Sequence, residues 1–378
     1  MDQAARAARR KGESALRRLI AAVLLGLACA SPGMPPGGPP DIAAPQIVGI
    51  IPDSGTLGVS PKEVLFRFDE VVSERPVAAT TLADLFLISP RDGTPNVSWH
   101  RDAIGVRPRR GWRPNTPYTV IMLPGLADIR GNVRNTGAST FFSTGKTIPR
   151  TRLAGRVFDW VSGTPAKAAL VESFVRSDTL HPYIALVDSS GAFAIDHMPP
   201  ARYTVRAYLD LNKNFAIDQS EPWDSTSVSL ADTTASTLLI FKHDSVAPRI
   251  RDVIAADSVT LGVGFDRPID PSQTLTTGNF ALIGPDSARV TIVSVGARAV
   301  PVDTLKPVMP RPSPISEVEL KLQRPLPSKT TYRVRAIGIR GILGYTGDSE
   351  RSYTTPAPPP PAAPKPAANP PGSPPVKK

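Results

Sequence analysis

Short segments of alternating apolar and polar residues recur along the whole chain and constrain its fold most strongly. In residues 203–209 the apolar side chains occupy every second position, which is the period of a strand with one buried face. The 43 prolines and 28 glycines stand between such segments as well as in the terminal stretches. Because proline ends strands and helices, this distribution favours β-sandwiches over helix bundles, and we predict an all-β protein.

The 378 residues are enough for two or three domains of ordinary size. We predict tandem β-sandwich modules between a disordered N-terminal tether and a disordered Pro-rich tail. The predicted segments are a signal region (1–29), a Pro/Gly-rich tether (30–45), a first β domain (46–147), a middle β domain (151–243), a third β domain (246–356) and a tail (357–378). Residues 301–316 contain five prolines, and we expect a long exposed loop there.

The formal net charge of +11 is partly local, because residues 1–18 carry four of these net charges. Nucleic-acid binding requires Lys and Arg gathered on one face, whereas here they are scattered through the predicted strands. The one dense run, residues 107–110, is interpreted as a solvated surface turn. We therefore expect no nucleic-acid partner.

Cys29 is the single cysteine, so neither a disulfide framework within the chain nor a cysteine zinc site is available. It follows a basic segment that ends at Arg18 and a short apolar run, residues 19–28. This arrangement resembles a bacterial lipoprotein signal, which implies lipidation of Cys29 and an outer-membrane location. Two alternatives stay open: cleavage after Ala30, which would remove the cysteine, and an apolar anchor that is retained.

An oxygen-rich loop follows the strand that ends near Leu209. Its side chains fall at positions 1, 3, 5, 9 and 12 of a twelve-residue calcium loop, with a backbone carbonyl at position 7. The predicted ligands are Asp210, Asn212, Asn214, Ala216, Asp218 and Glu221. Phe215 replaces the glycine that such loops have at position six, and no helix pattern precedes the loop. A polar turn without metal is the alternative.

The first β domain contains seven short strands in about a hundred residues, which is typical of an immunoglobulin-like sandwich. Its motifs are Gly58-Val59-Ser60, the strand at 65–71, residues 114–120, residues 126–132 and Phe142 to Gly145. These motifs resemble bacterial Ig-like domains of the SbsA type, found in S-layer and other surface proteins. The resemblance implies a sandwich fold and an envelope setting, with no activity.

The middle β domain combines residues 153–159, 162–166, 188–195 and 198–207 in an order that resembles carboxypeptidase regulatory-like, transthyretin-like sandwiches. That family carries no catalytic residues in this module. The third β domain repeats motifs of the first: residues 259–266 correspond to the strand at 65–69, and Phe280 corresponds to Phe86. It is therefore predicted to be a divergent Ig-like domain.

From these features we expect a non-enzymatic, exported envelope lipoprotein whose modules serve as structural, adhesion or scaffold units. It would contact the membrane through an N-terminal lipid or anchor, and an envelope polymer or protein is a further candidate partner. The alternatives are a calcium-dependent or polysaccharide-binding module and an accessory module of an envelope hydrolase.

No residue is assigned a catalytic role. Asp69, Glu70 and Asp128 are interpreted as strand-end turns and loop caps rather than an acid–base pair. Ser349 lacks the context of a serine nucleophile.

Overall fold

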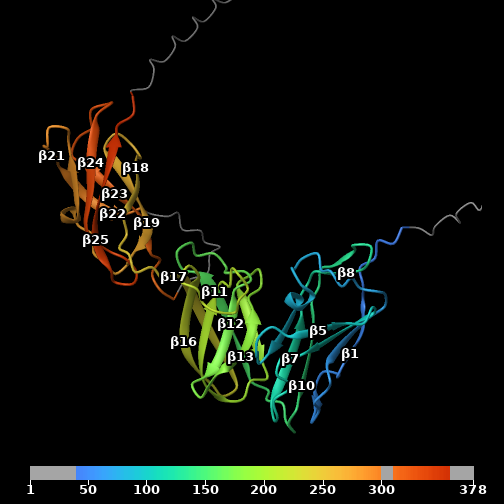
Figure 1. Cartoon of the computed structure of the whole chain (residues 1–378). Coiled ribbons are helices and arrows are strands. Elements are labelled where there is room, and N and C mark those ends of the chain that lie inside the picture. The colour runs from blue at the N-terminus through green and yellow to red at the C-terminus, as the bar shows by residue number, and fades with distance from the viewer. Residues whose placement is uncertain (1–39, 299–309, 358–378) are drawn as a thin grey trace, which may run out of the picture.

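The computed structural model describes residues 40–298 and 310–357, and these form three successive β modules (Figure 1). The all-β prediction is confirmed. Cys29, the signal region, most of the tether, part of the 301–316 segment and the tail from residue 358 lie outside the described residues. Within the described ranges, no helix has the length and apolar character needed to cross a membrane.

The first module packs two four-stranded sheets around one core. Their orders are β1-β3-β6-β5 and β2-β10-β7-β4, and β8 and β9 pair separately. The elements are β1 (Ile47–Ile51), β2 (Thr56–Leu57), β3 (Val64–Phe68), η1 (Leu82–Leu85), β4 (Phe86–Ser89), β5 (Asn96–Trp99), β6 (Ala103–Arg107), β7 (Pro117–Met122), β8 (Leu126–Ala127), β9 (Val133–Arg134) and β10 (Ala138–Ser143). The seven longer strands are those that the sequence pattern predicts.

The middle module is one seven-stranded sheet, in the order β13-β12-β15-β16-β17-β11-β14. Its strands are β11 (Arg152–Asp159), β12 (Leu170–Val175), β13 (Asp178–Leu186), β14 (Ala192–Asp196), β15 (Ala201–Tyr208), β16 (Pro222–Leu230) and β17 (Thr233–Lys242). β16 and β17 pair only at Pro222–Lys242 and Trp223–Phe241. The sheet therefore folds into two layers there, with Val157, Val171, Val205 and Leu238 buried in one core.

Position 155 in the middle module requires glycine, because the backbone of a neighbouring strand lies very close to it. Gly155 pairs with Ser236 where β11 runs parallel to β17. A Cβ atom at this position would lie 1.9 Å from the carbonyl oxygen of Ser236 and 2.7 Å from the ring of Phe193. Only glycine fits here without movement of the backbone.

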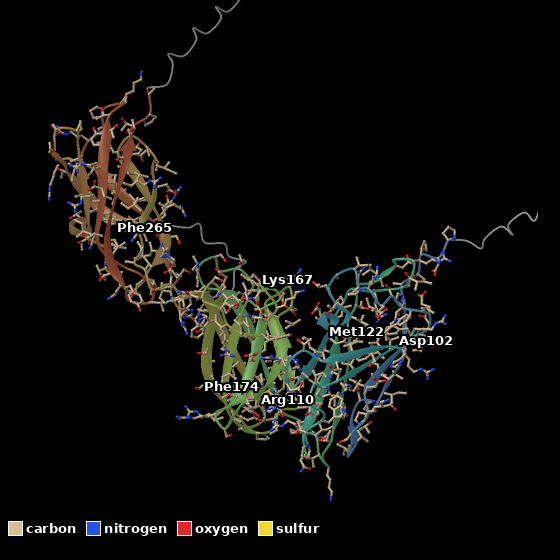
Figure 2. All side chains as sticks on the ribbon, viewed as in Figure 1. Asp102, Arg110, Met122, Lys167, Phe174 and Phe265 are labelled. Atoms are coloured by element: carbon tan, nitrogen blue, oxygen red, sulfur yellow. The ribbon has the colours of Figure 1, made fainter. Side chains whose placement is uncertain are left out.

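The third module again has two four-stranded sheets, in the orders β18-β19-β23-β22 and β21-β20-β24-β25. Its elements are β18 (Ile250–Ala255), β19 (Thr260–Ile269), η2 (Thr277–Asn279), β20 (Phe280–Ile283), β21 (Arg289–Val290), β22 (Ile292–Ala297), β23 (Ile315–Leu322), β24 (Thr331–Arg340) and β25 (Thr346–Thr354). β23 begins at Ile315, so the predicted loop ends two residues earlier than expected. Figure 2 labels two buried core side chains, Met122 of the first module and Phe265 of the third.

The first and third modules share the strand order of one sheet and of three strands of the other, where β4-β7-β10 corresponds to β20-β24-β25. The fourth strand of that sheet differs, because β2 pairs with β10 and β21 pairs with β20. Phe86 lies opposite Met122 across β4 and β7, and Phe280 lies opposite Ala336 across β20 and β24. A short 3-10 helix with a capping box precedes each of these phenylalanines, η1 after Thr81 and η2 after Thr276. The repeat read from the sequence is therefore present in the strand pairing.

Candidate functional site

The predicted calcium loop connects β15 to β16 at one end of the middle module. Asp210 organises its first half: one carboxylate oxygen accepts the Asn214 N–H at 3.0 Å and the other accepts the Phe215 N–H at 2.9 Å. Phe215 has φ of +59°, as does Lys213. The backbone at position six thus adopts the left-handed conformation that glycine favours, although the residue is phenylalanine.

The second half of the loop closes around Asp218 and Glu221. Glu221 is 1% exposed, and its two carboxylate oxygens accept the N–H groups of Leu211 and Asp218. The side-chain amides of Asn212 and Asn214 both donate to Asp218. The structure therefore brings the predicted ligand side chains together. Ala216, whose N–H donates to the Asn214 side chain, lies in the same turn.

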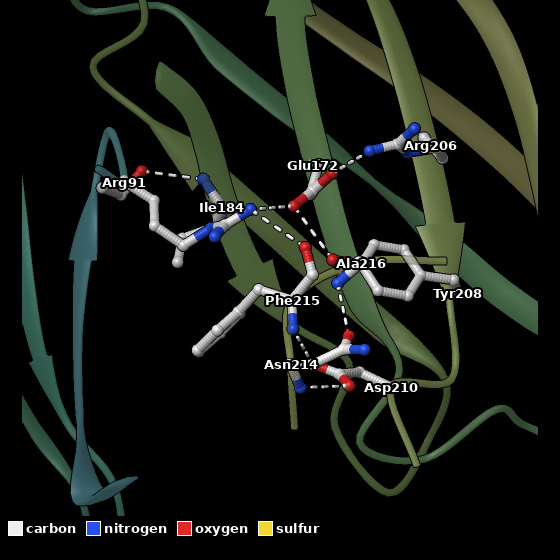
Figure 3. Close-up of polar contacts among 10 residues, drawn as sticks. Arg91, Glu172, Ile184, Arg206, Tyr208, Asp210, Asn214, Phe215 and Ala216 are labelled. Atoms are coloured by element: carbon white, nitrogen blue, oxygen red, sulfur yellow. Dashed lines mark hydrogen bonds and ion pairs between the residues drawn. The ribbon is translucent and has the colours of Figure 1, made fainter. Parts of the chain in front are cut away.

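The loop also contacts the first module through Arg91, which extends from the segment after β4 (Figure 3). Its Nη2 atom donates to Glu172 Oε1 at 2.6 Å and to the carbonyl of Phe215 at 3.4 Å. The guanidinium lies 4.7 Å from the centre of the Phe215 ring. Position six of the loop is thus part of the contact between two modules.

Glu172 is the buried acceptor of this contact, with a side-chain exposure of 1%. It also accepts from Arg206 at 2.5 Å and from the Tyr208 hydroxyl at 3.0 Å. Burial, followed by the adjacent Glu172 carboxylate, raises the pKa of Tyr208. We call Arg91, Glu172, Arg206, Tyr208 and Phe215 the Arg91 cluster. One carboxylate accepts hydrogen bonds from two guanidinium groups and a hydroxyl, whereas the buried Nε atoms of Arg91 and Arg206 have no hydrogen-bond partner among the described residues.

Apolar packing and two hydrogen bonds donated by backbone N–H groups surround the Arg91 cluster. The Arg91 N–H donates to the Pro182 carbonyl at 2.8 Å, and the Ile184 N–H donates to the Ser89 hydroxyl at 2.9 Å. The packed side chains are Leu87, Ile121 and Leu123 of the first module and Leu170, Ile184, Leu186, Tyr208, Phe215, Ile217 and Trp223 of the middle one. We call this whole contact the joint. No sequence pattern indicates this contact, because Arg91 stands in an ordinary turn sequence.

A second ion pair crosses the joint at its edge. Arg113 of the first module contacts Asp178 of the middle module at 2.7 Å, and His181 contacts the same carboxylate at 2.8 Å. Burial acts to raise the pKa of Asp178, but the hydrogen bonds from His181 and Arg113 outweigh it, and the pKa is lowered.

Three carboxylates converge elsewhere, on the first module. Asp41, Glu70 and Asp128 each place an oxygen within 4.8 Å of the others. Asp128 caps a turn: it accepts the N–H groups of Arg130 and Asn132. Burial opposes these bonds, yet the pKa of Asp128 is lowered. Burial and then the neighbouring Asp128 raise the pKa of Glu70. Asp128 therefore acts as a loop cap, as expected from the sequence.

Exposed tryptophan rings can stack on sugars, but three of the four tryptophans pack against other aromatic side chains. Trp112 packs edge-on against Tyr118 and Phe142, Trp160 contacts Phe241, and Trp223 stacks on His243 at 4.0 Å. Trp99 is 38% exposed. Ser349 lies in β25, where its hydroxyl accepts the Ile250 N–H.

Residues 41–144 match the family model described as the bacterial Ig-like domain. No curated protein matches the chain. The N-terminal part of the bacterial S-layer protein SbsC is 21% identical over 30% of this chain, and domains 1–6 of that protein are 10% identical over 85%, with TM-scores of 0.23 and 0.21. The chain covers 25% and 55% of those two structures.

A putative carbohydrate binding protein from Bacteroides uniformis is 13% identical over 55% of this chain and 99% of its own, with a TM-score of 0.18. Scores this low support no argument about function. The family match therefore identifies one module, and residues 41–144 form a bacterial Ig-like domain.

Proposed function

We propose that the chain is an exported, non-enzymatic protein of the bacterial cell envelope whose β modules serve as structural, spacer or adhesion units. The observation that carries the proposal is the joint, in which an Ig-like module is fixed to its neighbour through a buried ion pair. Interfaces between domains of one chain are often polar and mobile, whereas a packed, hydrogen-bonded contact holds modules in one orientation. A spacer or adhesion unit requires that its modules keep a fixed orientation relative to one another.

The middle module is, in this proposal, a carboxypeptidase regulatory-like, transthyretin-like sandwich without catalytic residues. Its support is the two-layered arrangement of seven strands and the sequence motifs on β11, β14 and β15. The third module is a divergent second Ig-like unit, supported by the strand order of one sheet, by three corresponding strands of the other and by the register that they share with the first module.

The proposed anchor is a lipid on Cys29, with cleavage after Ala30 or a retained apolar segment as alternatives. Cys29 lies next to the short apolar run, where lipidation requires a cysteine. Cells that express the protein should incorporate labelled fatty acid into it, and it should partition into the detergent phase. Cys29→Ser should abolish both properties, whereas the neighbouring change Ser31→Ala should abolish neither. Unchanged partitioning of Cys29→Ser would contradict lipidation and support a retained anchor.

A second candidate function is calcium binding at the loop from Asp210 to Glu221. The favouring observation is the left-handed backbone at Phe215, which matches the turn that a calcium loop makes at position six. Asp210, Asp218 and Glu221 would supply carboxylate oxygens, Asn212 and Asn214 amide oxygens, and Ala216 a carbonyl. Hard oxygen ligands of this kind suit Ca²⁺ better than softer transition metals.

Melting of the full chain in calcium, in magnesium and in EDTA tests this candidate. For a dissociation constant near 0.1 mM and about 1 mM calcium, binding adds about 1.4 kcal/mol. The corresponding rise in melting temperature is about 5 °C for a module near a hundred residues. Asp210→Asn should remove the rise, whereas Asp188→Asn, in the turn before β14 of the same module, should retain it. Equal melting temperatures in calcium and EDTA would leave the loop as a polar turn.

A further inference from the structure

The sheet of the third module that contains β20 and β24 corresponds to the sheet of the first module that contains β4 and β7. The outer faces of these two sheets carry different side chains. In the first module, Leu87 of β4 lies opposite Ile121 of β7, and both pack into the joint. In the third module, Ala281 of β20 and Arg335 of β24 occupy the equivalent positions. The face that docks in the first module is therefore replaced by an arginine-bearing face in the third.

The arginines on this face lie close together. Arg333 and Arg335 alternate along β24 with the buried Val334 and Ala336, so both point outward. Their side chains are 52% and 46% exposed. Arg289 of β21 belongs to the same row, because it lies opposite Ile283, which lies opposite Arg333. Arg289 and Arg333 thus lie in one row of the face, with Ile283 between them, and Arg335 lies in the next row of the same face.

The other side chains of the face are the hydroxyls of Ser352, Thr331 and Thr354 and the apolar Ala281 and Ile283. Ser352 lies opposite Arg333, and Thr331 pairs with Thr354 through a 2.9 Å hydrogen bond. Glu350 is the one carboxylate in these rows, at 3.3 Å from Arg335 and 3.7 Å from Arg333. Three arginines against one glutamate leave an excess of two positive charges. We call Arg289, Arg333, Arg335, Glu350 and Ser352 the β24 face.

We propose that the β24 face binds an acidic polysaccharide, a polymer that carries carboxylates and hydroxyls at regular spacing. Protein partners generally require an apolar centre in the interface. Here β24 carries arginines, and the apolar side chains beside them on β20 are the buried Ala281 and the half-buried Ile283. The guanidinium group of an arginine can donate two parallel hydrogen bonds to the two oxygens of one carboxylate. The neighbouring hydroxyls of the face can form hydrogen bonds with sugar hydroxyls.

This inference names a partner class for the proposed envelope function, but binding is measured on the purified chain and is independent of the anchor. Polygalacturonate is the probe, and neutral dextran is the comparison polymer. At 50 mM salt the full chain should bind polygalacturonate and not dextran. Binding should weaken strongly at 500 mM salt, because exposed charges are then screened.

Matched charge variants locate the contact. The pair Arg333→Ser and Arg335→Ser should weaken binding about tenfold, on the basis of two exposed ion pairs. The control pair Arg152→Ser and Arg156→Ser removes the same charge from two exposed positions on one face of β11 and should leave binding unchanged. Glu350→Gln removes the competing carboxylate and should strengthen binding about threefold.

Equal losses in the β24 pair and the β11 pair would overturn the proposal, because net charge alone would then explain the binding. Equal binding of polygalacturonate and dextran, or no binding at 50 mM salt, would overturn it as well. Sedimentation of the same samples covers the remaining alternative: self-association that disappears with Arg333→Ser and Arg335→Ser would assign the face to a second copy of the chain.

Discussion

The guanidinium of Arg91 reaches out of the first module and ion-pairs at 2.6 Å with Glu172, a carboxylate that is almost fully buried in the middle module. The two residues are 81 positions apart in the sequence. A buried carboxylate is stable only when its partners are in place, because loss of one leaves charge without compensation. The pair therefore ties the conformation of the middle module to the presence of the first.

Arg91→Ala should lower the free energy of unfolding by about 2 kcal/mol, less than for an isolated buried pair because Arg206 still neutralises Glu172. It should also separate the unfolding of the first module from that of the middle one, measured by calorimetry. The control is Arg152→Ala, whose ion pair with Asp196 is exposed and should contribute less than about 1 kcal/mol. A single transition that survives Arg91→Ala would contradict the role of this pair.

Phe215→Gly should separate calcium binding from the joint. Glycine adopts a φ of +59° without strain, so the loop should bind calcium more tightly than in the unchanged chain. The same change removes the ring beneath Arg91 and should lower the stability of the joint. Calcium titration followed by calorimetry measures both. Weaker calcium binding in Phe215→Gly would contradict the assignment of Phe215 to position six.

The seven longer strands of the first module were predictable because each alternates clearly. Strand β13 was not predictable, because it contains Pro182 and several polar residues. It tolerates the proline because it is the outermost strand of its sheet, where one side of the strand needs no partner. That Asp210, Asn212, Asn214, Asp218 and Glu221 come together in one loop was predictable from spacing. The contact between Phe215 and Arg91 was not, because it depends on how two modules pack, and no local sequence period records that packing.

Gly155→Ala should destabilise the middle module by about 3 kcal/mol or more, because the added methyl group would overlap the Ser236 carbonyl. Gly49 in β1 is the matched control, since a Cβ there has no atom within 4 Å. Gly49→Ala should change stability by about 0.5 kcal/mol or less. Denaturant unfolding measures both variants, and similar effects would contradict the close pairing of β11 with β17.

The Arg113–Asp178 pair should make the joint sensitive to acid. The pKa of Asp178 is below its ordinary value of 3.8, so its contribution is present above that value. The contribution should be lost as the pH falls through the lowered pKa. Asp178→Asn should therefore reduce stability at pH 7 and leave it unchanged at the lowest pH. If the free energies of unfolding of the unchanged chain and of Asp178→Asn differ by the same amount from pH 7 to pH 2, the Asp178 carboxylate is not the source of the acid sensitivity.

A rigid joint fixes the orientation of the first module relative to the middle module, and this orientation can be measured. Residual dipolar couplings of backbone amides in both modules report it in solution. We predict that one alignment tensor fits the couplings of both modules in the unchanged chain, and that Arg91→Ala requires two. Two different tensors in the unchanged chain would show that the modules reorient independently, and would contradict the rigid joint on which the proposed function depends.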